Sequence, residues 1–218
     1  MKPLIVPAAV LRGDRHLDHP PIVVDDDGVR YADGRRQDQL DSDFGVLLER
    51  WGGTATGTPQ YGVLDPEVQR HAVDRLLCAH CLGQPDREPG TGALWLLRAD
   101  DFRHAWPADI RTTTPPICRV HAELALERCA VLRAGHLAVR AREAEVVGVV
   151  GTLFAEDGHV ADTEALVLFT DPAALRFVLG RYLVLELRDA VPDPRFTPSS
   201  GQVPDIERST ARASRGSR

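Results

Sequence analysis

The sequence has very little serine outside its C-terminal end, and this shortage argues against a large class of enzymes. Ser42 is the only serine before Ser199. It lacks the Gly-x-Ser-x-Gly context that exposes the nucleophile of α/β-hydrolases. A cysteine nucleophile would have to be Cys129, because the other three cysteines fall into a metal-ligand pattern. The sequence supplies Cys129 with no evident general base.

Long apolar runs are also missing. The longest uncharged apolar stretch, residues 146–155, is far shorter than the roughly 20 residues of a membrane-spanning helix. Residues 1–12 contain an apolar run that Pro7 interrupts, and they lack a clear signal-peptide cleavage site. We therefore expect a cytoplasmic protein with no membrane segment.

Positive charge is not in excess. The chain has 26 Lys and Arg against 32 Asp and Glu, which gives a net charge of −6. Broad binding to a phosphate backbone requires a basic surface, so nucleic acid is not the expected partner. We expect the partner to be a protein or a small molecule of unknown identity.

Cysteine is scarce, but three of the four cysteines stand at ligand spacing. Cys78 and Cys81 form one pair, and Cys118 is followed by His121 at the same spacing. Two such pairs complete the tetrahedral set of sulfur and nitrogen ligands that Zn²⁺ prefers. The sequence therefore predicts a structural zinc site formed by Cys78, Cys81, Cys118 and His121. The alternative is that the two pairs are unrelated core thiols.

The segments around the ligands predict how the site is built. Residues 93–97 form an apolar strand that we expect in a β-hairpin between the pairs. Pro115-Pro116 leads into a helix over residues 118–133, which places Cys118 and His121 on one face of its first turn. A knuckle, a hairpin and such a helix form a treble-clef arrangement, here over residues 78–134.

Three segments resemble one particular family: Leu77-Cys78-x-x-Cys81, Ala93-Leu94-Trp95-Leu96-Leu97 and Pro115-Pro116-x-Cys118. They are similar to an uncharacterised actinobacterial family of zinc-binding proteins. In that family the second pair is usually Cys-x-x-Cys, and a further cysteine follows it. Here His121 stands at the fourth ligand's position and Cys129 at the extra one. The resemblance implies zinc, but it says little about activity, because treble-clef modules serve nucleases, nucleic-acid binders and structural modules alike.

Cys129 is predicted to lie outside the ligand set. It follows Cys118 by eleven residues, which is roughly 16 Å along a continuous helix at about 1.5 Å per residue. It shares a helix face with Ala125 and Leu132, so we expect a buried core thiol.

The rest of the chain predicts a single mixed α+β domain over residues 1–193 and a disordered basic tail over residues 194–218. We expect strands at 4–6, 21–24, 136–142, 146–154 and 165–169, and a hairpin turn at 25–28. Residues 98–114, which include Trp106, are expected to form a polar loop. Asp65-Pro66 and Asp171-Pro172 are typical helix starts. Apolar residues at 175, 178, 179, 182 and 185 predict that the second start opens a final long helix.

Two main functions fit these features. A zinc ion with four protein ligands fits a zinc-stabilised binding or adaptor protein. The alternative is an enzyme of a bacterial biosynthetic pathway whose pocket lies away from the zinc. A pocket with convergent polar groups would favour the enzyme, whereas an exposed apolar patch would favour the adaptor.

A zinc-dependent deaminase-like or HNH-like hydrolase is a weaker alternative. Zinc deaminases pair a His-x-Glu with a Cys-x-x-Cys, and His121-Ala122-Glu123 provides the first element. The order of the two elements is reversed here, and Cys118 would occupy the position that water needs. An HNH nuclease would need an Asp-His pair between the knuckle and the helix, where the sequence has none.

Overall fold

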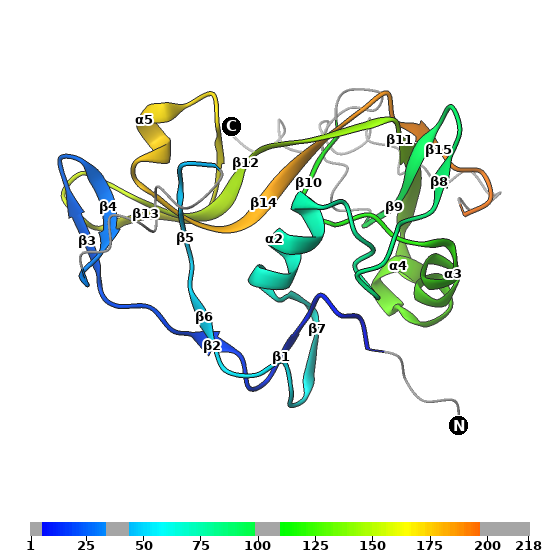
Figure 1. The fold of residues 1–218 in the computed structure, drawn as a ribbon, viewed down its shortest axis with the longest axis horizontal. Coiled ribbons are helices and arrows are strands. Elements are labelled where there is room, and N and C mark those ends of the chain that lie inside the picture. The colour runs from blue at the N-terminus through cyan, green and yellow to red at the C-terminus, as the bar shows by residue number, and fades with distance from the viewer. Residues whose placement is uncertain (1–5, 34–43, 99–109, 197–218) are drawn as a thin grey trace, which may run out of the picture.

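Strands dominate the structure. The computed structural model describes residues 6–33, 44–98 and 110–196, and its longest elements are strands (Figure 1). The four helices of this part are short: α2 (Pro66–Asp74), α3 (Arg119–Arg128), α4 (Ala130–Ala134) and α5 (Pro172–Leu175). None of them is long and apolar enough to cross a membrane. The predicted α+β class is wrong, because the described chain is mostly β and contains several sheets.

Two sheets form the body of the molecule. The larger has the order β10 (Ile110–Thr112), β14 (Val178–Arg188), β12 (Glu143–Phe154) and β13 (Val160–Leu168), and β5 (Leu47–Leu48) pairs in parallel with β14. The smaller has the order β15 (Val191–Pro192), β11 (His136–Ala141), β9 (Gly92–Arg98) and β8 (Arg87–Glu88). Three two-stranded pairs complete the described fold: β1 (Val10–Arg12) with β7 (Pro59–Leu64), β2 (His16–Leu17) with β6 (Trp51–Gly52), and β3 (Ile22–Asp25) with β4 (Gly28–Tyr31).

Short-range signals located several elements correctly. The predicted turn joins β3 to β4, with Gly28 at a φ of 117° that favours glycine. Asp65 caps α2 by accepting hydrogen bonds from the backbone N–H groups of Glu67 and Val68, and Pro66 takes the first helical position. The strands expected near β9, β11, β12 and β13 are present.

The predicted final helix is wrong. Asp171 and Pro172 start only the single turn α5, and the chain then enters β14. β14 is buried along most of its length and lies between β12 on one side and β10 and β5 on the other. Gly180 suits this position, because a Cβ there would lie only 3.1 Å from Leu48 Cδ2. A nearly continuous apolar run fits a buried strand as well as a helix, and strand pairing decided the outcome.

Other expectations fell on residues with a different or undescribed structure. β10 lies within the polar loop that we expected at 98–114. Trp106, residues 4 and 5 of the first expected strand, and the tail from residue 197 onward lie outside the described residues.

Strand β9 contributes to two separate cores. Alternate residues Ala93, Trp95 and Leu97 face a core shared with β11, β12 and β14. Leu94 and Leu96 point to the opposite face, where they pack with Ala122 and Ala125 of α3, with Cys78 and with Ile117. The second core places the helix and the two cysteine segments against the smaller sheet. We call it the metal-side core.

Helix α2 completes the edge of β14 with a side chain. β5 pairs with β14 at Leu179 and Gly180, and β10 pairs with it from Leu185 to Leu187. Between them, the buried Gln69 donates from Nε2 to the Leu183 carbonyl at 2.9 Å and accepts from the Leu183 N–H at 3.1 Å. The amide thus takes the place of a neighbouring strand at a position where water does not reach.

Replacing Gln69 should be costly for that reason. We expect Gln69→Ala to lower the free energy of unfolding by about 2 kcal/mol or more, because both backbone groups of Leu183 would be left unpaired in the interior. Urea denaturation measures the change. The control is Gln60→Ala in the exposed strand β7, which should shift stability by less than about 0.5 kcal/mol. Equal effects of the two substitutions would contradict this role of Gln69.

Candidate metal centre

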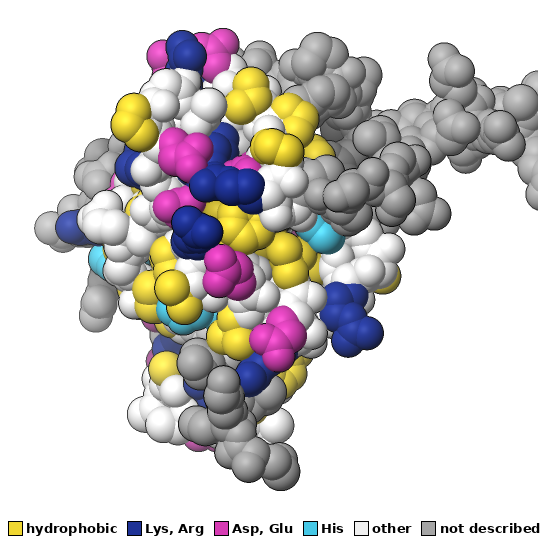
Figure 2. Space-filling view, turned by 90° about the vertical axis from the view of Figure 1, so that its right-hand side faces the viewer, with side chains coloured by type: hydrophobic (Ala, Val, Ile, Leu, Met, Phe, Trp, Pro, Cys, Tyr) yellow, Lys and Arg dark blue, Asp and Glu magenta, His cyan; other side chains and the backbone are white. Residues whose placement is uncertain are grey.

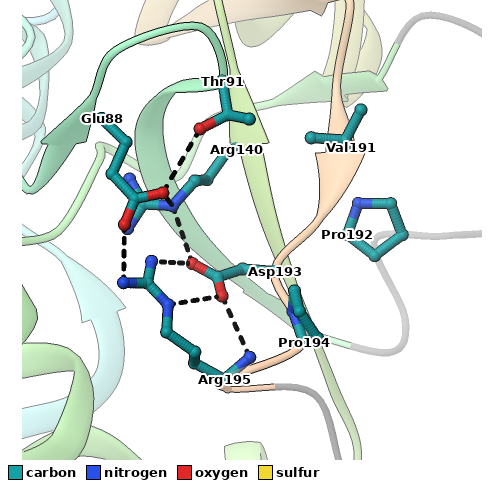
Figure 3. A pocket seen from close by; sticks show the side chains of 8 residues that line it. All are labelled: Glu88, Thr91, Arg140, Val191, Pro192, Asp193, Pro194 and Arg195. Atoms are coloured by element: carbon teal, nitrogen blue, oxygen red, sulfur yellow. Dashed lines mark hydrogen bonds and ion pairs between the residues drawn. The ribbon is translucent and has the colours of Figure 1, made fainter.

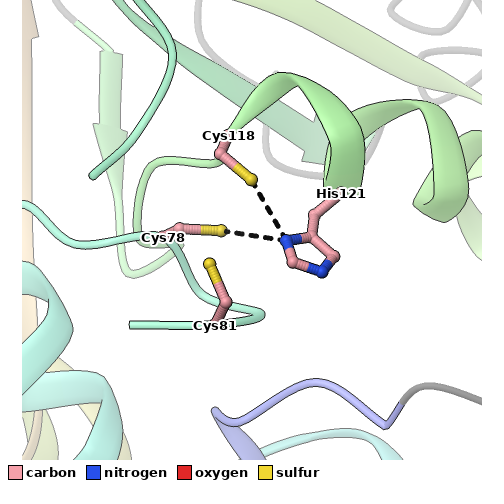
Figure 4. Close-up of side chains that lie close together, drawn as sticks. All are labelled: Cys78, Cys81, Cys118 and His121. Atoms are coloured by element: carbon pink, nitrogen blue, oxygen red, sulfur yellow. Dashed lines mark hydrogen bonds between the residues drawn. The ribbon is translucent and has the colours of Figure 1, made fainter. Parts of the chain in front are cut away.

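A tight knuckle after α2 supplies the first cysteine pair. The N–H of Cys78 donates to the carbonyl of Gly83 at 2.8 Å, and the N–H of Leu82 donates to the carbonyl of Cys78 at 2.8 Å. Leu82 adopts a left-handed backbone conformation with a φ of 54° to close this turn. Cys78 is buried and Cys81 is exposed, and their side chains enter from different directions so that the two sulfurs lie near one another (Figure 4).

The second pair opens helix α3. Cys118 is the N-cap residue, with an extended backbone, and His121 lies in the first turn. The N–H of Ile117 donates to the carbonyl of Leu94 at 2.9 Å, which fixes the entry of the chain against β9. Cys118 and His121 therefore present their ligand atoms from one end of the helix toward the knuckle (Figure 4).

The four side chains converge on one point. One ligand atom from each of Cys78, Cys81, Cys118 and His121 lies within 4.8 Å of all the others. Nδ1 of His121 is 3.1 Å from the sulfur of Cys118 and 3.8 Å from that of Cys78. A tetrahedral site with Zn–S bonds of about 2.3 Å has sulfur atoms about 3.8 Å apart. The donor set and its spacing therefore fit a metal ion, and three thiolates with one imidazole fit zinc.

The pKa values of two of the thiols are shifted in opposite directions. Burial raises the pKa of Cys118 to about 11, a backbone hydrogen bond from His121 opposes the rise, and the Cys78 sulfur adds to it. Burial also acts to raise the pKa of Cys78, but backbone hydrogen bonds from Cys118, His80 and Cys81 outweigh it, so that pKa is lowered. Neighbouring thiols resist joint ionisation, and a bound cation removes this penalty.

His80 stands between the first two cysteines without joining the cluster. Its ring stacks on that of His121, with the ring centroids 4.9 Å apart and an interplanar angle of 20°. Burial lowers the pKa of His80 to about 4, and His121 adds to this. Its buried Nδ1 has no hydrogen-bond partner among the described residues. A neutral ring here adds no positive charge beside a metal ion.

Backbone hydrogen bonds tie the two ligand pairs together. The N–H of Ala79 donates to the carbonyl of Pro116 at 3.0 Å, and the N–H of Asp86 donates to that of Ile117 at 3.1 Å. An N-terminal segment also covers the knuckle, since Ala8 donates to the carbonyl of His80 at 3.0 Å. No sequence pattern indicates this last contact, because it joins segments that are distant in the chain.

Cys129 lies outside the cluster, but its environment differs from the prediction. It is half-buried rather than buried. Its extended backbone, with φ −81° and ψ 112°, separates α3 from α4. The continuous helix expected over 118–133 is therefore two helices. Leu126 and Leu132, one from each helix, pack against the metal-side core.

A second polar feature lies beside the smaller sheet. A cavity of about 330 Å³ is lined by Glu88, Thr91, Arg140, Val191, Pro192, Asp193, Pro194 and Arg195 (Figure 3). Its charged groups bind one another. Arg140 Nε donates to Asp193 Oδ2 at 2.7 Å, and Arg195 bonds to Glu88 at 2.6 Å and to Asp193 at 2.7 Å. These contacts leave few polar groups directed at a ligand.

Arg140 is a buried cation that the sequence did not reveal. Its side chain is 2% exposed, and it bonds to the carboxylates of Asp86 and Asp193 and to the carbonyl of Gly92. The hydrogen bond from Arg195 lowers the pKa of Asp193 to about 2, burial opposes the shift, and Arg140 adds to it. The partners of Arg140 come from residues 86–92 and from Asp193, so only the folded chain brings them together.

The surface around the centre carries mixed charge. Figure 2 views the side of the molecule with α3 and α4, where acidic and basic side chains lie next to one another among apolar ones. On α3, Arg119 pairs with Glu123 at 3.3 Å.

Comparisons of the chain with protein-family models, curated proteins and solved structures find no match. The resemblance to an actinobacterial zinc family therefore stays a prediction from the motifs. The structure supports the coarser part of that prediction, because three cysteines and one histidine form a cluster that could hold a metal ion.

The cluster predicts different results for two cysteines that are not buried. Cys81→Ser should lower the zinc content well below one per chain, because a hydroxyl replaces a thiolate ligand. Cys129→Ser is the matched control and should keep one zinc per chain. Metal analysis of the purified proteins measures both. A reversed result would show that the ligand assignment is wrong.

The Asp193 network predicts a pH-dependent contribution to stability. The pKa of Asp193 is about 2 in the folded protein against an ordinary 3.8. Its ionised form therefore adds about 2 kcal/mol that is fully present above about pH 4 and lost as the pH falls toward 2. The stability difference between the wild type and Asp193→Asn should shrink as urea denaturation is repeated from pH 6 down to pH 3. A difference that stays constant would contradict the assignment.

Proposed function

We propose that this chain is a zinc-stabilised binding or adaptor protein, in which Cys78, Cys81, Cys118 and His121 hold one structural Zn²⁺ ion. The observation that carries the proposal is the convergence of four soft ligand atoms within 4.8 Å. The order of knuckle, β8–β9 hairpin and helix α3 supports a treble-clef-like module. The proposal keeps one domain, a cytoplasmic location and a basic C-terminal tail, but it moves the boundary from residue 193 to beyond Phe196, because Phe196 packs against the metal-side core.

A structural role follows from the ligand count. Three cysteines and one histidine fill a tetrahedral shell, so no position is left where water could bind and lose a proton. Glu123, the residue that a deaminase would use, is 59% exposed and paired with Arg119. It is also in the second turn of α3, outside the first turn that carries His121. These features favour a metal that holds the chain together over one that reacts.

The metal would compensate for a small core. The metal-side core has fewer buried members than the core on the other face of β9, and three of them, Ala122, Ala125 and Ala138, are alanines. Structural zinc contributes about 10–16 kcal/mol in isolated zinc fingers, which is comparable to the stability of a whole domain. A cross-link between the knuckle and α3 would fix the helix where apolar burial alone is limited.

A binding role fits the surface better than an enzyme pocket does. The cavity lined by Arg140 and Asp193 has its charges paired internally. Large apolar side chains are exposed elsewhere, including Val120 at 70% and Tyr61 at 57%. Tyr61 and Val63 lie in the part of β7 that is out of register with β1, on either side of Gly62, which has a φ of 95°. The partner in this proposal is a protein or a small molecule of unspecified identity.

The test is removal of the metal. Purified protein should contain one zinc per chain, and a strong chelator should lower the melting temperature by about 10 °C or more, because several kcal/mol are lost. Zinc should restore it, and calcium, which prefers oxygen ligands, should not. Glu123→Gln is the control and should match the wild type in zinc content and melting. A metal-free protein with unchanged melting would end the proposal.

A further inference from the structure

The segment of residues 191–196, which we call the strap, holds the smaller sheet from its edge. Val191 and Pro192 pair with β11, and the N–H of Asp193 donates to the carbonyl of Ala138 at 2.8 Å. At its other end Phe196 packs against the metal-side core. The ring of His136 lies between α4 and the strap, with Nδ1 2.8 Å from the Leu132 carbonyl and Nε2 2.7 Å from that of Phe196.

The strap supplies the most deeply buried counter-ion of Arg140. The side chain of Asp193 is 1% exposed, whereas those of Asp86 and Glu88 are 23% and 39% exposed. Arg140 is itself nearly inaccessible to solvent, so its position depends on buried partners. The strap therefore decides how firmly Arg140 is held.

Arg140 in turn holds Asp86, which connects the two ligand pairs. Nη2 of Arg140 bonds to the Asp86 carboxylate, and Nη1 lies 3.4 Å from the Asp86 carbonyl oxygen. The same Asp86 carbonyl accepts from Leu94 at 2.9 Å, and the Asp86 N–H donates to Ile117. Ile117 directly precedes the ligand Cys118, and Asp86 closes the segment that leaves the ligand Cys81.

We propose that the strap and Arg140 lock the metal centre closed, with Arg140 acting as a positioning residue through Asp86. This inference rests on the proposed zinc site. Release of the strap loosens Arg140 and Asp86, which lets the segment with the exposed Cys81 move away from Cys118. The strap thereby controls how fast the metal exchanges, although it supplies no ligand.

The test measures zinc transfer to a chromogenic chelator from the full-length protein. Asp193→Asn removes the buried counter-ion, and Phe196→Ala removes the apolar anchor at the other end of the strap. Each should release zinc about tenfold faster or more, the range typical of residues that orient metal ligands. Phe196→Ala keeps the experiment decisive if Asp193→Asn does not fold. With cobalt in place of zinc, both should retain the absorption spectrum of the wild type, because the ligands are unchanged.

The control is Glu49→Gln, which alters another buried carboxylate bonded to an arginine, Arg181, at 3.1 Å. It lies near β5 and β6, across α2 from the centre (Figure 1). Release at the wild-type rate from this control supports the lock. Equal acceleration in all three variants, or none in the strap variants, overturns it. A wild type without zinc would instead overturn the proposed function, and the inference with it.

Discussion

The burial of β9 on both faces is the constraint on which the rest of the structure depends. A strand with one solvated face alternates apolar and polar residues, but the run Ala93 to Leu97 is buried throughout. One face requires the larger sheet and the other requires a cover. Helix α3 and the cysteine segments provide that cover, so the candidate metal centre exists where the smaller sheet would otherwise expose Leu94 and Leu96.

The buried charge of Arg140 adds a different kind of constraint. Apolar packing tolerates many arrangements of similar volume, whereas a buried guanidinium needs carboxylates and carbonyls at defined positions. Its partners Asp86 and Asp193 come from the segment after the knuckle and from the strap. A buried ion network is weak evidence for stability, because desolvation offsets much of the attraction. Its contribution here is to select one mutual placement of three segments.

The sequence predicted what short-range chemistry determines. The spacing of Cys78, Cys81, Cys118 and His121 identified the four side chains that the fold brings together, and Asp65-Pro66 located the start of α2. The pairing of strands was harder to predict from the sequence. The run after Pro172 has apolar spacing compatible with a helix, and it became a strand because β12 was available to pair with it. Arg140 and the covering N-terminal segment left no local pattern, since their partners are distant in sequence.

Under the proposed function, the two constraints together indicate where a metal ion would add most to the fold. The larger core draws on β9, β11, β12 and β14 and does not include the residues on the opposite face of β9. The metal-side core has fewer buried members, since α3 contributes only Ala122, Ala125 and the partly buried Leu126, and the cysteine segments have little regular structure. Closing the chain between residues 81 and 118 costs entropy that this small apolar area repays poorly. Four ligands from the two ends of that segment would supply the missing cohesion, so loss of the metal should open this face first and leave the larger sheet paired.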